Sequence, residues 1–405
     1  TFADKRRYGL NSDKSAVLMV TPTSAQKPSD VEWTLRGDTL TPSDGLTHVG
    51  VVRHASHVPD SVVEDHIKTA SKCAYSLIGA GLHGNNGAGP KVCLQILKTY
   101  VLPRLLYGLE VILLSAKQIN TLNAGYLRLL RQIQGLPTRT ASSAVYVMVG
   151  TLPAEATLHL RQLSVIGAIA RGNNNTLKML AMRQLAVRSP KTSWFPRIDA
   201  LLVRYGLPSI ADLLDDPVPK ARWKRLCTNA VEDYWLCTLH ADIQTKSSLK
   251  YLQPPEKIST HQCWDTVRHS VKDVRRSTIK ARLLTRTYIL QTDKARFNQN
   301  DVDRTCPICC SADETYDHFI LHCEKLADVR EPHTSALCEV LQATTQYTWQ
   351  DLTTEEKLQL VLDCSKLAAD GNLQLGKKTM QAVEVISREM CFALHCRRTY
   401  MVDQL

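Results

Sequence analysis

The sequence predicts a mainly helical protein with a small β-rich segment at its N-terminus. Apolar residues recur at helical spacing through most of residues 58–171 and in the later part of residues 331–405. Short runs rich in β-branched residues occur in residues 1–57. The helical pattern is interrupted at residues 306–323, where cysteine and histidine gather in a short loop.

Length and composition fit a globular protein of about two or three domains. The most apolar stretch, residues 92–114, is broken by Lys98, Arg104 and Glu110, which argues against a membrane span. The charged start of the chain lacks the apolar core of a signal peptide. We therefore expect an intracellular protein, nuclear or cytoplasmic, that is neither secreted nor membrane-bound.

Positive charge is concentrated in the first half of the chain. The formal net charge is +11. Residues 1–200 contain 23 Lys and Arg against 12 Asp and Glu, whereas residues 201–405 contain 27 of each kind. Such a surplus favours a polyanionic partner, RNA or DNA. It also fits a large domain that uses charge only to stay in solution.

The N-terminal segment has the pattern of a sheet edge. Residues 16–21 form an apolar β run, and residues 31–40 predict a hairpin whose turn contains Gly37 and Asp38. Residues 47–52 predict one further strand, in which a glycine suits a bulge or a close backbone approach. These strands are too few for a self-sufficient sheet, so we expect more of the sheet upstream.

Start and stop signals divide residues 60–171 into helices. In chain order they are a capping box of Ser61 with Glu64, Pro90, a kink at Pro103, an N-cap at Ser115, a stop at Gly135 and Pro137, and Pro153. The helix after Ser115 has one apolar face and carries Lys117, Arg128 and Arg131 on the other. These three cations are candidate nucleic-acid contacts.

Residues 262–290 predict one long basic helix. Its candidate nucleic-acid contacts are Arg268, Lys272, Arg275, Arg276, Lys280, Arg282 and Arg286. Five of these fall at helical offsets and form one stripe, while Val267, Val271 and Val274 lie on another face. The stripe contains a single acid and leads directly into the cysteine loop, which favours nucleic-acid contact over an ordinary solvated face.

Two helices are expected in residues 331–405. Thr353 and Glu356 form a capping box for the first. The second covers about residues 377–398, with Met380, Val383, Met390 and Leu394 facing inward. No residues there have catalytic spacing.

The cysteine loop has the spacing of a metal site. The chain contains 13 cysteines, an odd number that suits free thiols in a reducing compartment. Cys306 and Cys309 are separated by two residues, and the turn between them points both thiolates at one ion. His318 and Cys323 follow closely enough to return two more ligands. Three sulfurs and one imidazole select tetrahedral Zn²⁺.

The register of this metal site remains open at the level of sequence. Cys310 is able to replace Cys309, and His322 is able to replace His318, without loss of the site. The four residues are also compatible with unrelated buried side chains in a cysteine-rich chain.

Several of these segments together resemble the reverse transcriptase of non-LTR (LINE-type) retrotransposons, from the end of its palm to its C-terminus. Residues 7–20 look like the turn and strand that follow the catalytic aspartates of the palm, and Thr47-His48-Val49-Gly50-Val51 is similar to the primer-grip hairpin. Residues 100–110 match the thumb pattern Y-x-x-P-x-L-x-Y-G-x-E. Residues 279–288 and 306–323 are similar to the C-terminal zinc-knuckle segment.

The resemblance implies a division of the chain into five parts. They are a residual palm edge with a primer-grip-like hairpin (1–57), a thumb-like helical domain (58–171), a helical connector ending in the basic helix (172–290), a CCHC zinc knuckle (291–330) and C-terminal helices (331–405). His48 and Val49 depart from the aromatic and leucine that usually precede the primer-grip glycine.

The resemblance also implies that the catalytic carboxylates are absent from this sequence. Such polymerases need Mg²⁺ held by aspartates from two palm motifs. Phe2-Ala3-Asp4 is followed by Lys5 and not by a second aspartate, so we interpret it as a chance match. The sequence begins with Thr1 and not with Met, and we expect a fragment that neither polymerises nor cuts nucleic acid alone, with Mg²⁺ confined to the missing polymerase site.

Three functions are consistent with this sequence. The leading one is a nucleic-acid-binding fragment of the reverse transcriptase, with RNA or DNA as its partner and with neither a small-molecule substrate nor a membrane. The second is a part of an RNA-directed DNA polymerase that acts only with its upstream palm. The third is a host protein that uses a zinc staple for protein contacts.

Overall fold

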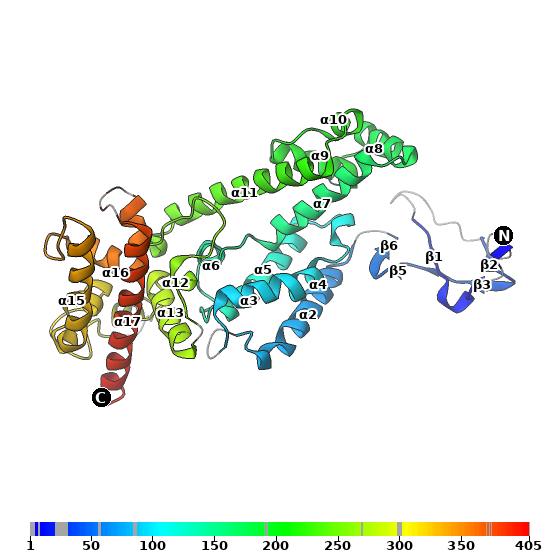
Figure 1. Cartoon of the computed structure of the whole chain (residues 1–405). Coiled ribbons are helices and arrows are strands. Elements are labelled where there is room, and N and C mark those ends of the chain that lie inside the picture. The colour runs from blue at the N-terminus through cyan, green and yellow to red at the C-terminus, as the bar shows by residue number, and fades with distance from the viewer. Residues whose placement is uncertain are drawn as a thin grey trace. The chain divides into compact units, whose positions relative to one another are not determined.

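A computed structural model describes residues 5–6, 9–20, 31–55, 58–83, 87–189, 191, 193–268, 270–297, 302–369, 371, 373 and 375–404. The described chain is mainly helical and carries small two-stranded sheets, as the sequence predicts (Figure 1). Phe2-Ala3-Asp4, which resembles a palm motif, lies outside the described residues.

The chain divides into two compact units, each assembled from separate segments. The first unit comprises Thr1–Thr69, Pro103–Leu122 and Leu158–Cys227. The second comprises Ala70–Leu102, Asn123–Thr157 and Thr228–Leu405. Four long helices cross these boundaries in sequence: α2 (Asp60–Ser76), α5 (Ala116–Ile133), α7 (Ala154–Arg171) and α11 (Lys220–Thr245).

The strands of the first unit pair locally and do not merge into one sheet. A 3₁₀ turn, η1 (Ser12–Lys14), precedes β1 (Val17–Leu18), which pairs in parallel with β4 (Pro42–Ser43). The predicted hairpin forms between β2 (Trp33–Leu35) and β3 (Asp38–Leu40). Its turn residues are Arg36 and Gly37, both with positive φ, and not Gly37 with Asp38 as the sequence suggested.

The single strand predicted over residues 47–52 is wrong, because this segment is the tip of a second hairpin. β5 (Gly45–His48) pairs in antiparallel fashion with β6 (Val51–His54). Val49 and Gly50 form the two-residue turn with φ of 51° and 73°. Positive φ at both central residues matches the twist of the flanking strands, so the chain reverses where a continuous strand was expected.

The helical part of the first unit is built around apolar helix faces. Besides the crossing helices it contains α4 (Leu102–Leu106), η4 (Leu109–Val111), α8 (Asn175–Val187), α9 (Trp194–Arg204) and α10 (Ile210–Asp215). Trp223 lies against Gly167, where an added Cβ would meet the indole ring at 2.3 Å. The indole nitrogen donates to the carbonyl of Leu163 at 2.7 Å, so the glycine permits close approach of α7 and α11.

The kink predicted at Pro103 takes the form of a change in helix type. α3 (Pro90–Ile96) starts at a proline, as expected, and continues as the π-helical segment η3 (Leu97–Val101) directly before α4. A proline lacks the N–H that an α-helix needs and clashes with the preceding turn. Widening the turns just before Pro103 accommodates that ring without ending the helix.

The N-cap predicted at Ser115 is confirmed. Ser115 N–H donates to the Gln118 side chain at 2.8 Å, and Gln118 N–H donates to Ser115 Oγ at 3.2 Å. Gly135, with a φ of 61°, follows the end of α5, as predicted. By contrast, α2 begins at Asp60, so Ser61 lies inside the first turn and does not cap the helix.

The second unit is helical. Its remaining elements are η2 (Ile78–Ala80), α6 (Ser142–Val149), η5 (Ser247–Leu249), α12 (Gln262–Asp265), α13 (Val271–Leu284), α14 (Gln291–Phe297), η6 (His318–His322), η7 (Glu324–Leu326), α15 (Ala327–Thr344), α16 (Thr354–Ala369) and α17 (Lys377–Val402). Figure 1 shows α17 beside α15 and α16, which it contacts. The capping box of Thr353 with Glu356 is confirmed at the start of α16.

Two sequence expectations for the second unit are wrong. Three helices, not two, occupy the described part of residues 331–405, because α15 was missed. The continuous basic helix over residues 262–290 is interrupted: α12 ends at Asp265, and Ser270 then caps a new helix by accepting from Asp273 N–H. Arg268 therefore precedes α13, and Arg286 follows its end.

Candidate metal centre

The first half of the cysteine loop is a tight hairpin. Cys306 N–H donates to the carbonyl of Ala312 at 2.8 Å, and Cys310 N–H donates to the carbonyl of Cys306 at 2.9 Å. An isolated bridge joins Thr305 to Asp313 just outside these bonds. The two bonds fold the Cys306–Cys309 segment back on itself, so both thiols point to the same side.

The second half of the loop is a π-helical turn. Cys323 N–H donates to the carbonyl of His318 at 2.7 Å, a bond that spans five residues. In an α-helix, residues five apart point in clearly different directions, because the repeat is about 3.6 residues. The wider π turn brings His318 and Cys323 into closer alignment, so that both face the hairpin.

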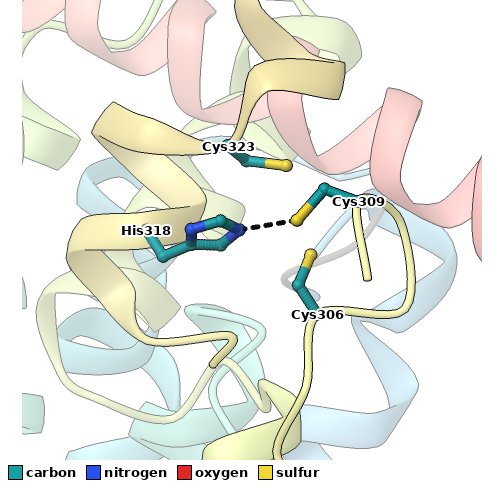
Figure 2. Close-up of side chains that lie close together, drawn as sticks. All are labelled: Cys306, Cys309, His318 and Cys323. Atoms are coloured by element: carbon teal, nitrogen blue, oxygen red, sulfur yellow. Dashed lines mark hydrogen bonds between the residues drawn. The ribbon is translucent and has the colours of Figure 1, made fainter. Parts of the chain in front are cut away.

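The four predicted ligands meet at one point. Figure 2 shows Cys306, Cys309, His318 and Cys323 converging, and their four ligand atoms lie within 4.8 Å of one another. Cys309 Sγ is 3.3 Å from His318 Nε2. In a tetrahedral zinc site the ligand atoms are separated by roughly 3.5–3.8 Å, which follows from Zn–S and Zn–N bonds of about 2.3 and 2.0 Å. The observed spacing therefore suits an ion of this size with little rearrangement.

The structure decides between the registers that the sequence left open. Cys309 belongs to the group, whereas Cys310 is exposed and has a φ of 55°. His318 is buried and belongs to the group, whereas His322 is exposed on the outside of the π turn. The thiol of Cys310 lies instead 3.9 Å from the carbonyl of Pro307.

The electrostatics of these four side chains favour the binding of a cation. Although burial opposes the thiolate, hydrogen bonds from Ser311 lower the pKa of Cys309 to about 6. Burial, together with the neighbouring thiols, raises the pKa of Cys323 to about 12 and also raises that of Cys306. Three thiolates cannot share this space without a positive charge between them, and a divalent ion supplies that charge.

The helices of the second unit hold both halves of the loop in place. Arg330 on α15 donates to the carbonyls of Ile320 and Cys323, each at 2.8 Å. Arg398 on α17 forms a two-pronged ion pair with the fully buried Glu314, both contacts at 2.7 Å. Phe319 stacks on Tyr288 with ring centroids 5.6 Å apart. A site with four protein ligands and such support is closed, which fits a structural ion and not a catalytic one.

One candidate nucleic-acid contact is corrected by the structure. Lys280 is fully buried, and its ammonium group pairs with Glu384 at 2.6 Å. The residue lies on the face of α13 that packs against α17, so it is unavailable to a polyanion. Of the valines on the other face of the predicted basic helix, Val274 is buried, whereas Val271 is 44% exposed.

The other candidate cations fall into two groups. Three of them are partly buried and bond to other residues of the second unit. Arg276 forms an ion pair with Glu389 at 2.5 Å, and Arg282 and Arg131 donate hydrogen bonds to backbone carbonyls. The exposed cations are Arg268, Lys272, Arg275, Arg286, Lys117 and Arg128. Of these, Lys117 pairs with Asp60 and Arg128 donates to Ser71.

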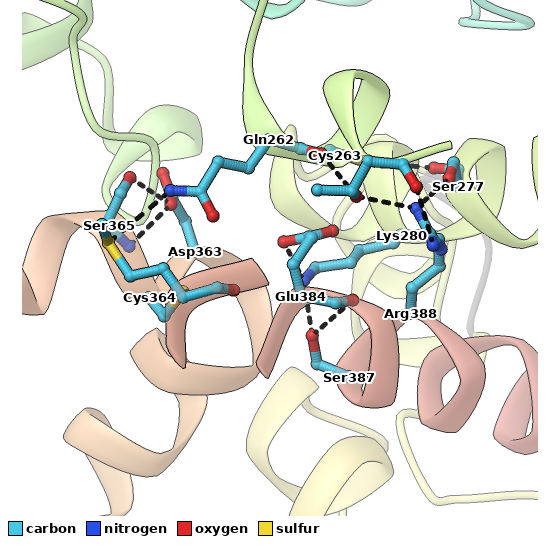
Figure 3. Close-up of polar contacts among 12 residues, drawn as sticks. Gln262, Cys263, Ser277, Lys280, Asp363, Cys364, Ser365, Glu384, Ser387 and Arg388 are labelled. Atoms are coloured by element: carbon cyan, nitrogen blue, oxygen red, sulfur yellow. Dashed lines mark hydrogen bonds and ion pairs between the residues drawn. The ribbon is translucent and has the colours of Figure 1, made fainter. Parts of the chain in front are cut away.

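A buried ionic cluster between α13 and α17 was missed by sequence reasoning. Figure 3 shows Lys280 reaching Glu384 and Ser387, and Arg388 reaching Ser277. Arg388 also lies 3.4 Å from the carboxylate of Asp273. A signal for this cluster existed: Glu384, Ser387 and Arg388 repeat at three- and four-residue spacing beside the apolar stripe of α17.

In the part of the chain that the structure describes, none of the helices combines the length and the apolar character that a membrane span requires. Searches against protein-family models and curated proteins return no significant match to this chain.

Proposed function

We propose that this chain is a zinc-stabilised, nucleic-acid-binding part of a non-LTR (LINE-type) reverse transcriptase. The observation that carries the proposal is the convergence of Cys306, Cys309, His318 and Cys323. These residues occupy the position at which the sequence resemblance puts a CCHC knuckle. In this proposal zinc fixes the knuckle and, through it, the surrounding helices, and contributes no chemistry of its own.

A contact within the first unit gives independent support. The hydroxyl of Tyr107 donates to the carbonyl of Val49 at 2.9 Å. Val49 is at the tip of the hairpin that resembles a primer grip, and Tyr107 belongs to the segment that resembles a thumb. Gly108 approaches Val51 so closely that a Cβ there would lie 2.6 Å from it. Two segments that resemble neighbouring parts of one polymerase thus lie against each other.

Exposed cations supply the affinity in this proposal. Arg268, Lys272, Arg275 and Arg286 are exposed on the second unit, in or beside α13. Arginine and lysine bind phosphates without reading sequence, and binding releases condensed counterions. RNA-directed DNA synthesis, with its Mg²⁺ ions, belongs in this proposal to catalytic aspartates outside these 405 residues.

The experiment is a binding measurement on the purified chain at two salt concentrations. With roughly four phosphate contacts, affinity for labelled single-stranded RNA and for an RNA–DNA duplex is expected to fall about 100-fold between ~50 and ~200 mM salt. Absence of binding, or binding that ignores salt, would contradict the proposal. A chain that keeps its zinc and its fold but binds neither probe would favour the alternative hypothesis, in which zinc stabilises a module for protein contacts.

A further inference from the structure

A second site lies on the second unit, beside the metal-binding loop. It is a pocket of about 340 Å³. Its lining residues include three arginines and two aspartates, which are Arg286, Arg296, Arg304, Asp293 and Asp317. The volume is within the range of small-ligand sites, and the three cations outnumber the two acids.

Arg286 is the residue that makes this pocket unusual. It directly follows the end of α13, with a φ of 55°. Arg286 N–H donates to the carbonyl of Leu283 at 3.1 Å, and Thr287 N–H donates to that of Arg282 at 2.8 Å, which closes the helix in the manner that glycine normally allows. The left-handed backbone at position 286 favours glycine and not arginine. The backbone conformation therefore does not account for the presence of an arginine here.

The side chain of Arg286 is positioned for a ligand. Its guanidinium group lies over the ring of the buried Tyr316 at 4.0 Å from the centroid. Stacking orients the planar group while leaving its N–H donors available. Among the described residues, no carboxylate forms an ion pair with Arg286 or with the exposed Arg304.

The two acidic residues of the pocket restrict the class of ligand further. The carboxylate of Asp293 already has partners within the chain, since it accepts a hydrogen bond from Leu290 N–H and lies 3.9 Å from the guanidinium group of Arg296. Asp317 is half-buried in the wall. A simple inorganic anion gains nothing from a carboxylate, whereas a nucleotide offers both an anionic phosphate and the amino edge of a base, which a carboxylate accepts.

We propose that this pocket binds one nucleotide, with the phosphate on Arg286 and Arg304 and the base edge near Asp317. The choice of nucleotide rests on the proposed function, in which the nucleotide is one unit of a bound strand. The site then fixes a strand beside the knuckle, in addition to the non-specific contacts of the exposed cations. A free nucleotide and a nucleotide within a strand share this chemistry, and the experiment separates them.

The test compares wild-type chain with Arg286→Gly, Arg286→Lys and Lys257→Gln, using guanosine 5′-monophosphate, inorganic phosphate and a labelled single-stranded RNA 12-mer as probes. Glycine suits the backbone at position 286, so Arg286→Gly keeps the fold and the zinc content, which are measured in parallel. We expect Arg286→Gly to weaken binding of both the nucleotide and the 12-mer by about tenfold. Arg286→Lys is expected to recover only part of this, because lysine loses the planar stack.

The matched control is Lys257→Gln, which removes the same charge from an exposed position of the second unit that neither lines the pocket nor belongs to the cations proposed to bind nucleic acid. It should leave nucleotide affinity unchanged. If wild type binds the 12-mer and Arg286→Gly binds both probes equally well, the pocket proposal is overturned while the proposed function stands. Binding of the nucleotide without the 12-mer overturns the proposed function and keeps the pocket. Binding of inorganic phosphate as tight as that of the nucleotide, or of no probe at all, overturns the nucleotide site.

Discussion

Lys280 and Glu384 face each other in the core of the second unit, with Nζ 2.6 Å from Oε2 and side chains that are 0% and 1% exposed. Burial alone would lower the pKa of Lys280, but attraction to Glu384 outweighs burial and raises it. Ser387 accepts a second hydrogen bond from the ammonium group at 2.6 Å. The ammonium group of Lys280 therefore stays charged although it is removed from water.

Removal of one partner should be strongly destabilising. Lys280→Met leaves Glu384 buried without its counter-charge, and we expect a loss of about 3–5 kcal/mol in the free energy of unfolding. Chemical denaturation measures this loss. The control is Arg276→Met, which removes a partly exposed pair between the same two helices and should cost no more than ~1 kcal/mol. Equal losses in the two variants would show that burial of the Lys280 pair is not what matters.

The metal group predicts a sharp difference between neighbouring residues. Cys306→Ser should abolish stoichiometric zinc binding and loosen the cysteine loop, because the variant removes one of four candidate ligands. Cys310→Ser and His322→Gln should retain full zinc content, since neither side chain belongs to the group. Elemental analysis of the purified variants checks both statements. Loss of zinc from Cys310→Ser would reject the ligand set.

A buried carboxylate predicts how the free energy of unfolding depends on pH. Asp363 accepts from His261 Nε2 at 3.1 Å and from Gln253 N–H at 2.8 Å. Although burial opposes its charged form, the facing His261 and these hydrogen bonds lower the pKa of Asp363 to about 2. A lowered pKa stabilises the fold above the unfolded value of about 4, and the contribution is lost as pH falls towards 2.

The measurement for Asp363 is the free energy of unfolding of wild type minus that of Asp363→Asn across pH. We expect this difference to be constant between about pH 4 and pH 6 and to shrink by about 2 kcal/mol on acidification to pH 2. Above about pH 6 the difference shrinks as well, because Asp363 raises the pKa of His261 and this contribution is lost when His261 gives up its proton. Subtraction removes the contribution of other carboxylates. A difference that stays constant down to pH 2 would mean that Asp363 titrates normally in the folded chain.

The contact between hairpin tip and helix predicts the outcome of two glycine substitutions. Gly108 has a φ of 74°, and an alanine Cβ there would lie 2.6 Å from Val51 Cγ2. Gly206, also in the first unit, has a φ of 62° with no atom near its Cβ position. Gly206→Ala should cost about 1 kcal/mol from backbone strain alone. Gly108→Ala should cost about 1–3 kcal/mol more, because Val51 must also move. Thermal unfolding compares the two, and equal shifts would mean that the hairpin does not pack on Gly108.

Local signals in the sequence located many elements correctly. The caps at Ser115 and Thr353 and the starts at Pro90 and Pro153 depend on residues within one turn of each other, so near neighbours determine them. The same holds for the metal group, whose ligands lie within 18 residues of chain. Even there, the choice of Cys309 over Cys310 depended on a backbone angle that spacing does not reveal.

By itself, the sequence determined that the chain is mainly helical, where several of its helices begin, and which short loop can hold a metal ion. Tertiary structure alone decided that Lys280 is buried and that Arg286 lines a pocket. The physical reason is that a helix face is exposed or buried according to its partner. The helix that packs on α13 is α17, about a hundred residues further along the chain. No residue pattern within α13 indicates that a carboxylate at position 384 will face Lys280.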